Sequence, residues 1–106
     1  MTLTKAQEEA LNWTQEEAAE VIQIISKIKR HGLRSRHPYI ENACSNQEEL
    51  LKELGDLMAA ISALGDLEIA LTNQVLSKSY IKLASLENEN HFCHIGFKGL
   101  RIYPLR

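Results

Sequence analysis

The sequence predicts an all-α fold: an antiparallel helical bundle that is completed by oligomerisation and followed by an irregular C-terminal tail. Apolar residues recur at three- and four-residue steps through most of the first 86 residues, which is the period of amphipathic helices. The 106 residues are 44% hydrophobic and 25% charged, an ordinary composition for one compact domain. We therefore expect a helical domain over residues 1–86 and a tail over residues 87–106. Because so short a chain buries a small share of its surface, we expect a partner subunit to supply the missing burial.

The first helix is predicted from Thr4 to about Arg30. Thr4 and Gln7 form a candidate capping box, and Gly32 is suited to end the helix. The residues that follow, 33–46, contain Pro38 and many polar side chains and predict a loop. The expected apolar stripe of this helix consists of Ala10, Thr14, Ala18, Val21, Ile25 and Ile28.

The second helix is predicted to begin at Ser45 or Asn46 and to end at Gly65. Its apolar stripe consists of Leu50, Leu51, Leu54, Leu57, Met58, Ile61 and Leu64. A third helix is expected from about Glu68 to Leu86. The last twenty residues lack a helical period, and we expect an irregular tail with room for one short strand over residues 95–102.

Composition argues against several classes of protein. No apolar run approaches the roughly 20 residues that cross a bilayer, so no membrane partner is expected. Residues 1–10 do not resemble a secretory signal, and two cysteines are too few for a disulfide framework, which favours a cytoplasmic location. The net charge of −2 conceals one basic block: residues 27–37 carry five basic side chains and no acid, between two acidic stretches. Nucleic-acid binding needs basic charge spread over a face, so no nucleic-acid partner is expected.

Two pairs of acidic residues lie in line with the apolar stripes. Glu17 and Glu20 are three residues apart on the first helix, and Glu53 and Asp56 are three apart on the second. If the helices pack antiparallel, the pairs can meet, and four carboxylates in one place need a cation. Carboxylate oxygen is the ligand that Mg²⁺ prefers. The alternative is that each pair belongs to a solvated face, which is how we interpret Glu8, Glu9, Glu48 and Glu49.

The basic block is the complementary half of the predicted site. Lys27 lies seven residues after Glu20, on the same helix face, and Arg30 follows one turn later. We expect both to hold phosphate oxygens, although cations at a helix C-terminus also serve the helix dipole alone. Loop residues Arg34, Arg36 and His37 are further candidates, and Lys78 and Lys82 on the third helix are expected to approach from the other side.

These residues match a known family signature. Glu16-Glu17-Ala18-Ala19-Glu20 followed by Glu53-Leu54-Gly55-Asp56 resembles the EExxE…ExxD motif of the MazG-like, all-α nucleoside triphosphate pyrophosphohydrolases. The surrounding segments EEAAEVIQIISKIKRHG and EELLKELGDLMAAISAL also resemble small phage-type members, and the likeness covers about residues 8–66. The 32 residues between Glu20 and Glu53 are more than compact members have, and the extra length falls in the loop around Pro38.

The resemblance implies hydrolysis of a nucleoside triphosphate between its α and β phosphorus atoms, which gives a monophosphate and pyrophosphate. By position, the Mg²⁺ ligands would be Glu17, Glu20, Glu53 and Asp56, with Mn²⁺ as a substitute ion, and Glu17 would also be catalytic. Glu16 would stand behind the ligands or be the base that orients the attacking water. Trp13 and Asn12 are the expected base-binding residues, with a purely structural role for Trp13 as the alternative. The family implies a homodimer or homotetramer.

Other interpretations remain open at this stage. A non-catalytic helical module for protein interaction or nucleotide binding is the main alternative, and a helical nucleic-acid-binding regulator is disfavoured by the charge. His91, Cys93 and His94 resemble part of a soft metal site but are too few to complete a tetrahedron. Cys44 has no adjacent base and is expected to be inert. Gly55 inside the second helix indicates either a close backbone approach or a tolerated imperfection.

Overall fold

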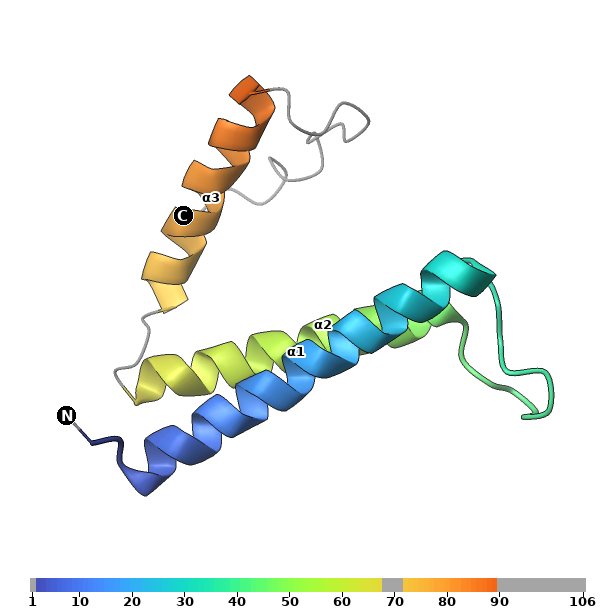
Figure 1. Cartoon of the computed structure of the whole chain (residues 1–106), viewed down its shortest axis with the longest axis horizontal. Coiled ribbons are helices and arrows are strands. Elements are labelled where there is room, and N and C mark those ends of the chain that lie inside the picture. Colours follow the sequence, from blue (N-terminus) through green and yellow to red (C-terminus); the bar gives the residue numbers. More distant parts are fainter. Residues whose placement is uncertain (1, 68–71, 90–106) are drawn as a thin grey trace. The chain divides into compact units, whose positions relative to one another are not determined.

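The structure, a computed structural model, describes residues 2–67 and 72–89; for Thr72 and residues 87–89 it describes the backbone alone. The described residues form three α-helices, α1 (Lys5–His31), α2 (Asn46–Asp66) and α3 (Thr72–Glu89) (Figure 1). Within these ranges there is no strand, only an isolated antiparallel bridge between Arg36 and Ser45. The all-α prediction is thus confirmed for the part of the chain that is described. The chain divides into two compact units, Met1–Leu71 and Thr72–Arg106, and the predicted domain over residues 1–86 stays a prediction.

Helix α1 begins and ends as its sequence predicts. The Thr4 hydroxyl accepts a hydrogen bond from the Gln7 backbone N–H at 3.0 Å, and the Gln7 side chain accepts one from the Thr4 N–H at 3.0 Å. This capping box satisfies two backbone donors that have no partner inside the helix. At the other end Gly32 adopts φ 91°, a conformation that favours glycine, and its N–H donates to the Ile28 carbonyl at 2.7 Å.

Helices α1 and α2 lie side by side and antiparallel within the first unit (Figure 1). A repeat of alternating three- and four-residue steps on each helix forms the seam between them. Its members on α1 are Ala10, Thr14, Glu17, Val21, Ile24 and Ile28, and those on α2 are Asn46, Leu50, Glu53, Leu57, Ala60 and Leu64. All of them are buried or half-buried, so this seam is the core of the unit, and two of its twelve positions are glutamates.

The predicted apolar stripes were wider than the seam. Ile25 is 39% exposed, whereas Ile24 is 5% exposed and takes the seam position. One residue rotates a helix by about 100°, so only one of two adjacent isoleucines can face the partner helix. On α2 the same geometry leaves Leu51, Leu54 and Met58 exposed although the sequence predicted them in the stripe.

Two side-chain hydrogen bonds fix the register of the helix pair at its ends. The Asn46 amide, 2% exposed, donates to the Gly32 carbonyl at 2.9 Å. At the opposite end the Gln7 amide donates to the Leu67 carbonyl at 3.3 Å. Because a buried polar group without its partner is costly, the Asn46 bond disfavours any sliding of α2 along α1.

The connection between α1 and α2 is held by its own backbone. The N–H groups of Asn46 and Gln47 donate to the carbonyls of Ser35 and Leu33, each at 2.9 Å. Arg36 donates to the Ala43 carbonyl at 2.8 Å, and the Ser45 hydroxyl caps α2 by accepting from the Glu48 N–H at 3.2 Å. Helix α2 therefore starts where the sequence predicts, and it runs one residue beyond Gly65, to Asp66.

Helix α3 extends three residues beyond the predicted end at Leu86, to Glu89. Residues 87–89 contain no glycine or proline, and glutamate is a good helix former, so the helix continues after its last apolar residue. The predicted start at Glu68, the predicted tail from residue 90 onwards with its short strand, and His91, Cys93 and His94 lie outside the described residues. Among the helices described, none is both long enough and apolar enough to cross a bilayer.

The two long sides of the α1–α2 pair differ in character. One side, here called the apolar side, carries Leu11, Ala18, Ile22, Ile25, Leu51, Leu54, Met58 and Ile61. The other, the charged side, carries Trp13, Glu16, Glu20, Gln23, Lys27, Glu49, Lys52 and Asp56. Residues seven apart repeat on the same side of a helix, so both sides follow directly from the heptad pattern. The predicted site residues of α1 and α2 lie mainly on the charged side and in the adjoining seam.

Candidate metal centre

Four carboxylates from two helices converge on the charged side. Glu17 and Glu20 come from α1, and Glu53 and Asp56 come from α2. One oxygen of each lies within 4.8 Å of one oxygen of every other. The antiparallel seam explains the meeting, because Glu17 and Glu53 occupy seam positions and their i+3 neighbours flank the seam on the same side. The structure thus brings together the two acid pairs, and their role as metal ligands stays a prediction.

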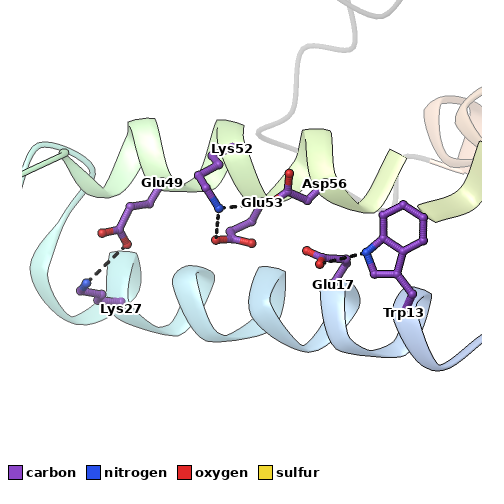
Figure 2. A network of polar contacts seen from close by, with 7 residues as sticks. All are labelled: Trp13, Glu17, Lys27, Glu49, Lys52, Glu53 and Asp56. Atoms are coloured by element: carbon purple, nitrogen blue, oxygen red, sulfur yellow. Dashed lines mark hydrogen bonds and ion pairs between the residues drawn. The ribbon is translucent and has the colours of Figure 1, made fainter. Parts of the chain in front are cut away.

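The two seam glutamates each carry an oxygen without a partner. The Oε2 atoms of Glu17 and Glu53 are buried and accept no hydrogen bond. The other oxygen of Glu17 accepts a hydrogen bond from the Trp13 indole N–H at 3.2 Å (Figure 2). A buried carboxylate oxygen without a donor is costly, and a cation among the four side chains would relieve that cost. Since all four groups offer hard oxygen ligands, the donor set fits Mg²⁺ or Mn²⁺ and does not fit a soft, sulfur-preferring metal.

The crowding of carboxyl groups raises the pKa of Glu20. A carboxyl–carboxyl hydrogen bond with Glu53, which requires a proton on one partner, raises the pKa of Glu20 to about 7. The negative charges of Glu53 and Glu17 raise this pKa further, while Lys52 opposes them. The cluster therefore holds a proton that ordinary glutamates would have lost near pH 5.

One lysine reaches the cluster from its own helix. The Lys52 ammonium lies 3.1 Å from Asp56 Oδ2 and 3.4 Å from Glu53 Oε1 (Figure 2). These two carboxylates raise the pKa of Lys52 above its ordinary value, the contribution of Asp56 being the larger. Its side chain is 67% exposed, whereas that of Glu53 is only 16% exposed. Lys52 therefore approaches the acids from the solvent side.

An open cavity of about 550 Å³ is lined by two of the four carboxylates, Glu20 and Glu53. This volume lies within the usual range of small-molecule sites. Its lining is mixed in charge and comprises Glu20, Gln23, Ile24, Lys27, Arg30, Glu49, Lys52 and Glu53. Lys27 and Glu49 form an ion pair across it, with 3.4 Å between Nζ and Oε2 (Figure 2). Two of the metal-ligand candidates thus share one cavity with the cations Lys27, Arg30 and Lys52.

The remaining predicted site residues lie on two helices, α1 and α3. Glu16 is exposed on the charged side, in register with Gln23 of the cavity, while Asn12 is exposed on the side of α1 turned away from α2. Trp13 lies beside Glu17 and is 40% exposed. Lys78 and Lys82 lie on α3 in the second unit, and their approach to the site stays a prediction.

The loop cations behave differently from the expectation. Arg36 donates to the Ala43 carbonyl within the loop and forms an ion pair with Glu48, in the first turn of α2, at 3.4 Å. The backbone N–H of Tyr39 donates to the His37 ring at 3.2 Å. These three contacts stabilise the connection between the helices, and neither Arg36 nor His37 lines the cavity. Cys44 is free and exposed.

Two charged residues of the cavity lining, Glu49 and Lys52, were missed by sequence reasoning. Glu49 was assigned to a solvated face, and Lys52 was not singled out at all. The heptad repeat contains the signal for both: Glu49 stands seven residues before Asp56, and Lys52 stands four before it. Residues at these separations share a helix face, so each belongs with Asp56 on the charged side.

Comparisons with protein-family models, with curated proteins and with solved structures found no match to this chain.

Proposed function

We propose that the chain is a Mg²⁺-dependent nucleoside triphosphate pyrophosphohydrolase that releases a nucleoside monophosphate and pyrophosphate. The observation that carries the proposal is the convergence of Glu17, Glu20, Glu53 and Asp56 beside a cavity that also contains cations. The same four residues are those that the motif resemblance assigns as ligands. Mn²⁺ is the expected substitute ion, because it accepts the same oxygen ligands.

The residues of the site divide the chemistry between them. Glu17, Glu20, Glu53 and Asp56 would hold the ion, which when bound neutralises phosphate charge and lowers the pKa of water. The buried oxygens of Glu17 and Glu53, which have no hydrogen-bond partner, support this assignment. Glu16, exposed on the charged side, is proposed to accept the proton of the attacking water.

Lys27 and Arg30 line the cavity and are proposed to contact the phosphate chain of the substrate. A substrate phosphate that binds Lys27 has to displace Glu49 from its ion pair with this lysine. Both side chains of the pair are half-exposed, so the ion pair is weak. Cations held against the leaving pyrophosphate stabilise the charge that develops on it. Lys78 and Lys82 are proposed as additional phosphate contacts from α3.

Trp13 is the proposed contact for the base. Its indole N–H is fixed on Glu17, so the ring is held beside the acid cluster while its exposed portion offers a stacking surface. Asn12 lies on the side of α1 that is turned away from α2. We therefore propose that any base it contacts is bound at the site of a neighbouring subunit.

We further propose that the active species is a homodimer or homotetramer formed through the apolar side. Among the described residues of the first unit, only four hydrophobic side chains are buried, those of Ala10, Ile24, Ala60 and Leu64. Meanwhile Ile22, Leu51 and Met58 on the apolar side are 65%, 64% and 67% exposed. A second copy presents the same surface, so a symmetric contact covers both at once and leaves the charged sides open to substrate. The proposed setting is nucleotide metabolism in the cytoplasm of a bacterium or a phage-infected cell.

The catalytic proposal is tested by incubating the full chain with a panel of ribo- and deoxyribonucleoside triphosphates, with Mg²⁺ and with EDTA. We expect Mg²⁺-dependent formation of monophosphate and pyrophosphate in equal amounts, resolved by chromatography. Diphosphate with orthophosphate as products, or no turnover of any substrate, would contradict the proposal. The latter result would favour the non-catalytic nucleotide-binding or protein-interaction alternative, which equilibrium binding of the same nucleotides then examines.

The oligomer is tested by light scattering on Met58→Glu and on Ala59→Glu. Both residues are exposed on α2, but Met58 lies on the apolar side and Ala59 on the other. We expect Met58→Glu to dissociate the assembly and Ala59→Glu to leave it intact. A monomeric wild-type chain would overturn this part of the proposal alone.

A further inference from the structure

Lys52 is the one cation that the described residues place in contact with the acid cluster. Its ammonium pairs with Asp56 and with Glu53, the two ligand candidates of α2. It is also part of the cavity lining, together with Lys27 and Arg30. A single side chain thus borders both the proposed metal position and the proposed phosphate position.

The contacts of Lys52 leave the cluster incompletely neutralised. It reaches one oxygen each of Glu53 and Asp56, while the buried Oε2 atoms of Glu17 and Glu53 remain without a partner. An ammonium is a compact charge on a flexible four-carbon stem, so it can leave one partner for another at small cost. With 67% of its side chain exposed, Lys52 is not packed in its present position. By contrast, a divalent cation has the charge and the coordination number to engage all four carboxylates.

We propose that Lys52 is the resident counter-cation of the four carboxylates in the absence of a divalent ion, and that it becomes a phosphate ligand in the adjoining cavity once the ion binds. The inference rests on the proposed function, because it takes the four acids as the ligands and the cavity as the phosphate position. It gives Lys52 two successive partners, and the exchange needs only a change of side-chain rotamer. Metal binding and phosphate binding are thereby linked through one residue.

The proposal makes two predictions of opposite sign for the removal of the charge in Lys52→Met. Without the competing ammonium, the acids bind a divalent ion more tightly. Because the two ion pairs that are lost both involve a largely exposed lysine, we expect the Kd for Mn²⁺ to fall about threefold to tenfold. Without a phosphate ligand, inorganic pyrophosphate binds more weakly in the presence of Mg²⁺, and we expect its Kd to rise about tenfold or more. Lys52→Arg keeps the charge and should stay close to the wild type in both measurements.

The matched control is Lys29→Met. Lys29 is an exposed lysine of α1 on the side away from the acids, so its replacement changes the net charge equally without touching the site. Mn²⁺ affinity is measured on the full chain by isothermal titration and by the electron paramagnetic resonance signal of free Mn²⁺. Thermal unfolding in EDTA is recorded for all variants, and we expect Lys52→Met to lower Tm more than Lys29→Met does.

The outcomes separate the two proposals. If the wild type binds no Mn²⁺, both the proposed function and the role of Lys52 are overturned. If the wild type binds Mn²⁺ but Lys52→Met binds it with unchanged or lower affinity, the role of Lys52 falls while the metal centre stands. A lower Tm of Lys52→Met, with no change in the Kd for Mn²⁺ or in the Kd for pyrophosphate, would mean that the role of Lys52 is only structural. Tighter Mn²⁺ and weaker pyrophosphate binding together, absent in Lys29→Met, support the proposal.

Discussion

Glu53→Gln is expected to stabilise the metal-free protein and to destabilise the metal-loaded protein relative to wild type. Glu53 occupies a seam position, its side chain is 16% exposed, and one of its oxygens is buried without a hydrogen-bond partner. An unsatisfied buried group costs about 1–3 kcal/mol. The glutamine amide removes one negative charge from the cluster and can donate to a neighbouring carboxylate. We therefore expect the metal-free variant to gain about 1–3 kcal/mol, which raises Tm by at least about 4 °C in a domain of this size.

With the ion present the sign reverses. A ligand that binds only the folded state contributes about 2.7 kcal/mol at a hundredfold excess over Kd, and the variant lacks one of the four ligands that this binding needs. The assay is thermal unfolding followed by circular dichroism in EDTA and in excess MgCl₂. Exposed Glu9 on α1 supplies the control, and Glu9→Gln should stay within about 0.5 kcal/mol of wild type in both conditions.

Two results would refute this reasoning. A Glu53→Gln variant that is less stable than wild type in EDTA would show that the carboxylate is stabilising as it stands, through contacts other than a metal. Equal stabilisation of wild type and variant by MgCl₂ would show that the ion binds elsewhere.

Three further predictions follow from the same geometry. The pKa of Glu20 is raised from its ordinary value of 4.5 to about 7, so between these pH values the folded state holds a proton that the unfolded state has lost. Tm in EDTA should therefore fall as the pH rises from about 4.5 to 7. Glu20→Gln should make Tm less dependent on pH in this range. Glu17→Gln and Asp56→Asn should each abolish Mg²⁺-dependent turnover while leaving the helical circular dichroism intact, and full activity in either would contradict the ligand assignment. Gly55→Ala should add about 0.5–1 kcal/mol to the free energy of unfolding, since nothing lies within 4 Å of the added methyl group; a lower Tm would mean that another subunit approaches there.

Much of the fold of the first unit follows from local sequence signals. The capping box at Thr4, the stop at Gly32 and the cap at Ser45 each depend on a few adjacent residues, and all three were predictable. The identity of the seam was harder to predict, because the stripes offered more apolar residues than one partner helix covers. Ile24 rather than Ile25 faces α2, and that choice depends on the register between the helices.

The candidate site shows the same division. The meeting of the acid pairs was expected from their spacing, because two antiparallel helices with heptad seams bring equivalent positions together. The contribution of Lys52 depends on how one long side chain extends toward Asp56, which the sequence indicates only as a four-residue separation. The assignment of Gly55 was left open by the sequence, and within the described residues the structure supports the tolerated imperfection.

The hydrogen bonds of Asn46 and Gln7 hold the two ends of the helix pair together. The pair should therefore tolerate a change of length in the connection between its helices, but not within a helix. Residues may be added to the connection around Pro38 without altering which positions of α1 face α2, because both ends of the pair remain pinned. A single residue inserted into α1 between Glu20 and Ile24 turns everything beyond it by about 100°. Such an insertion separates the acids from the cavity cations Lys27 and Arg30. Natural variants of this chain should therefore differ in length between the two helices and keep a constant spacing within each.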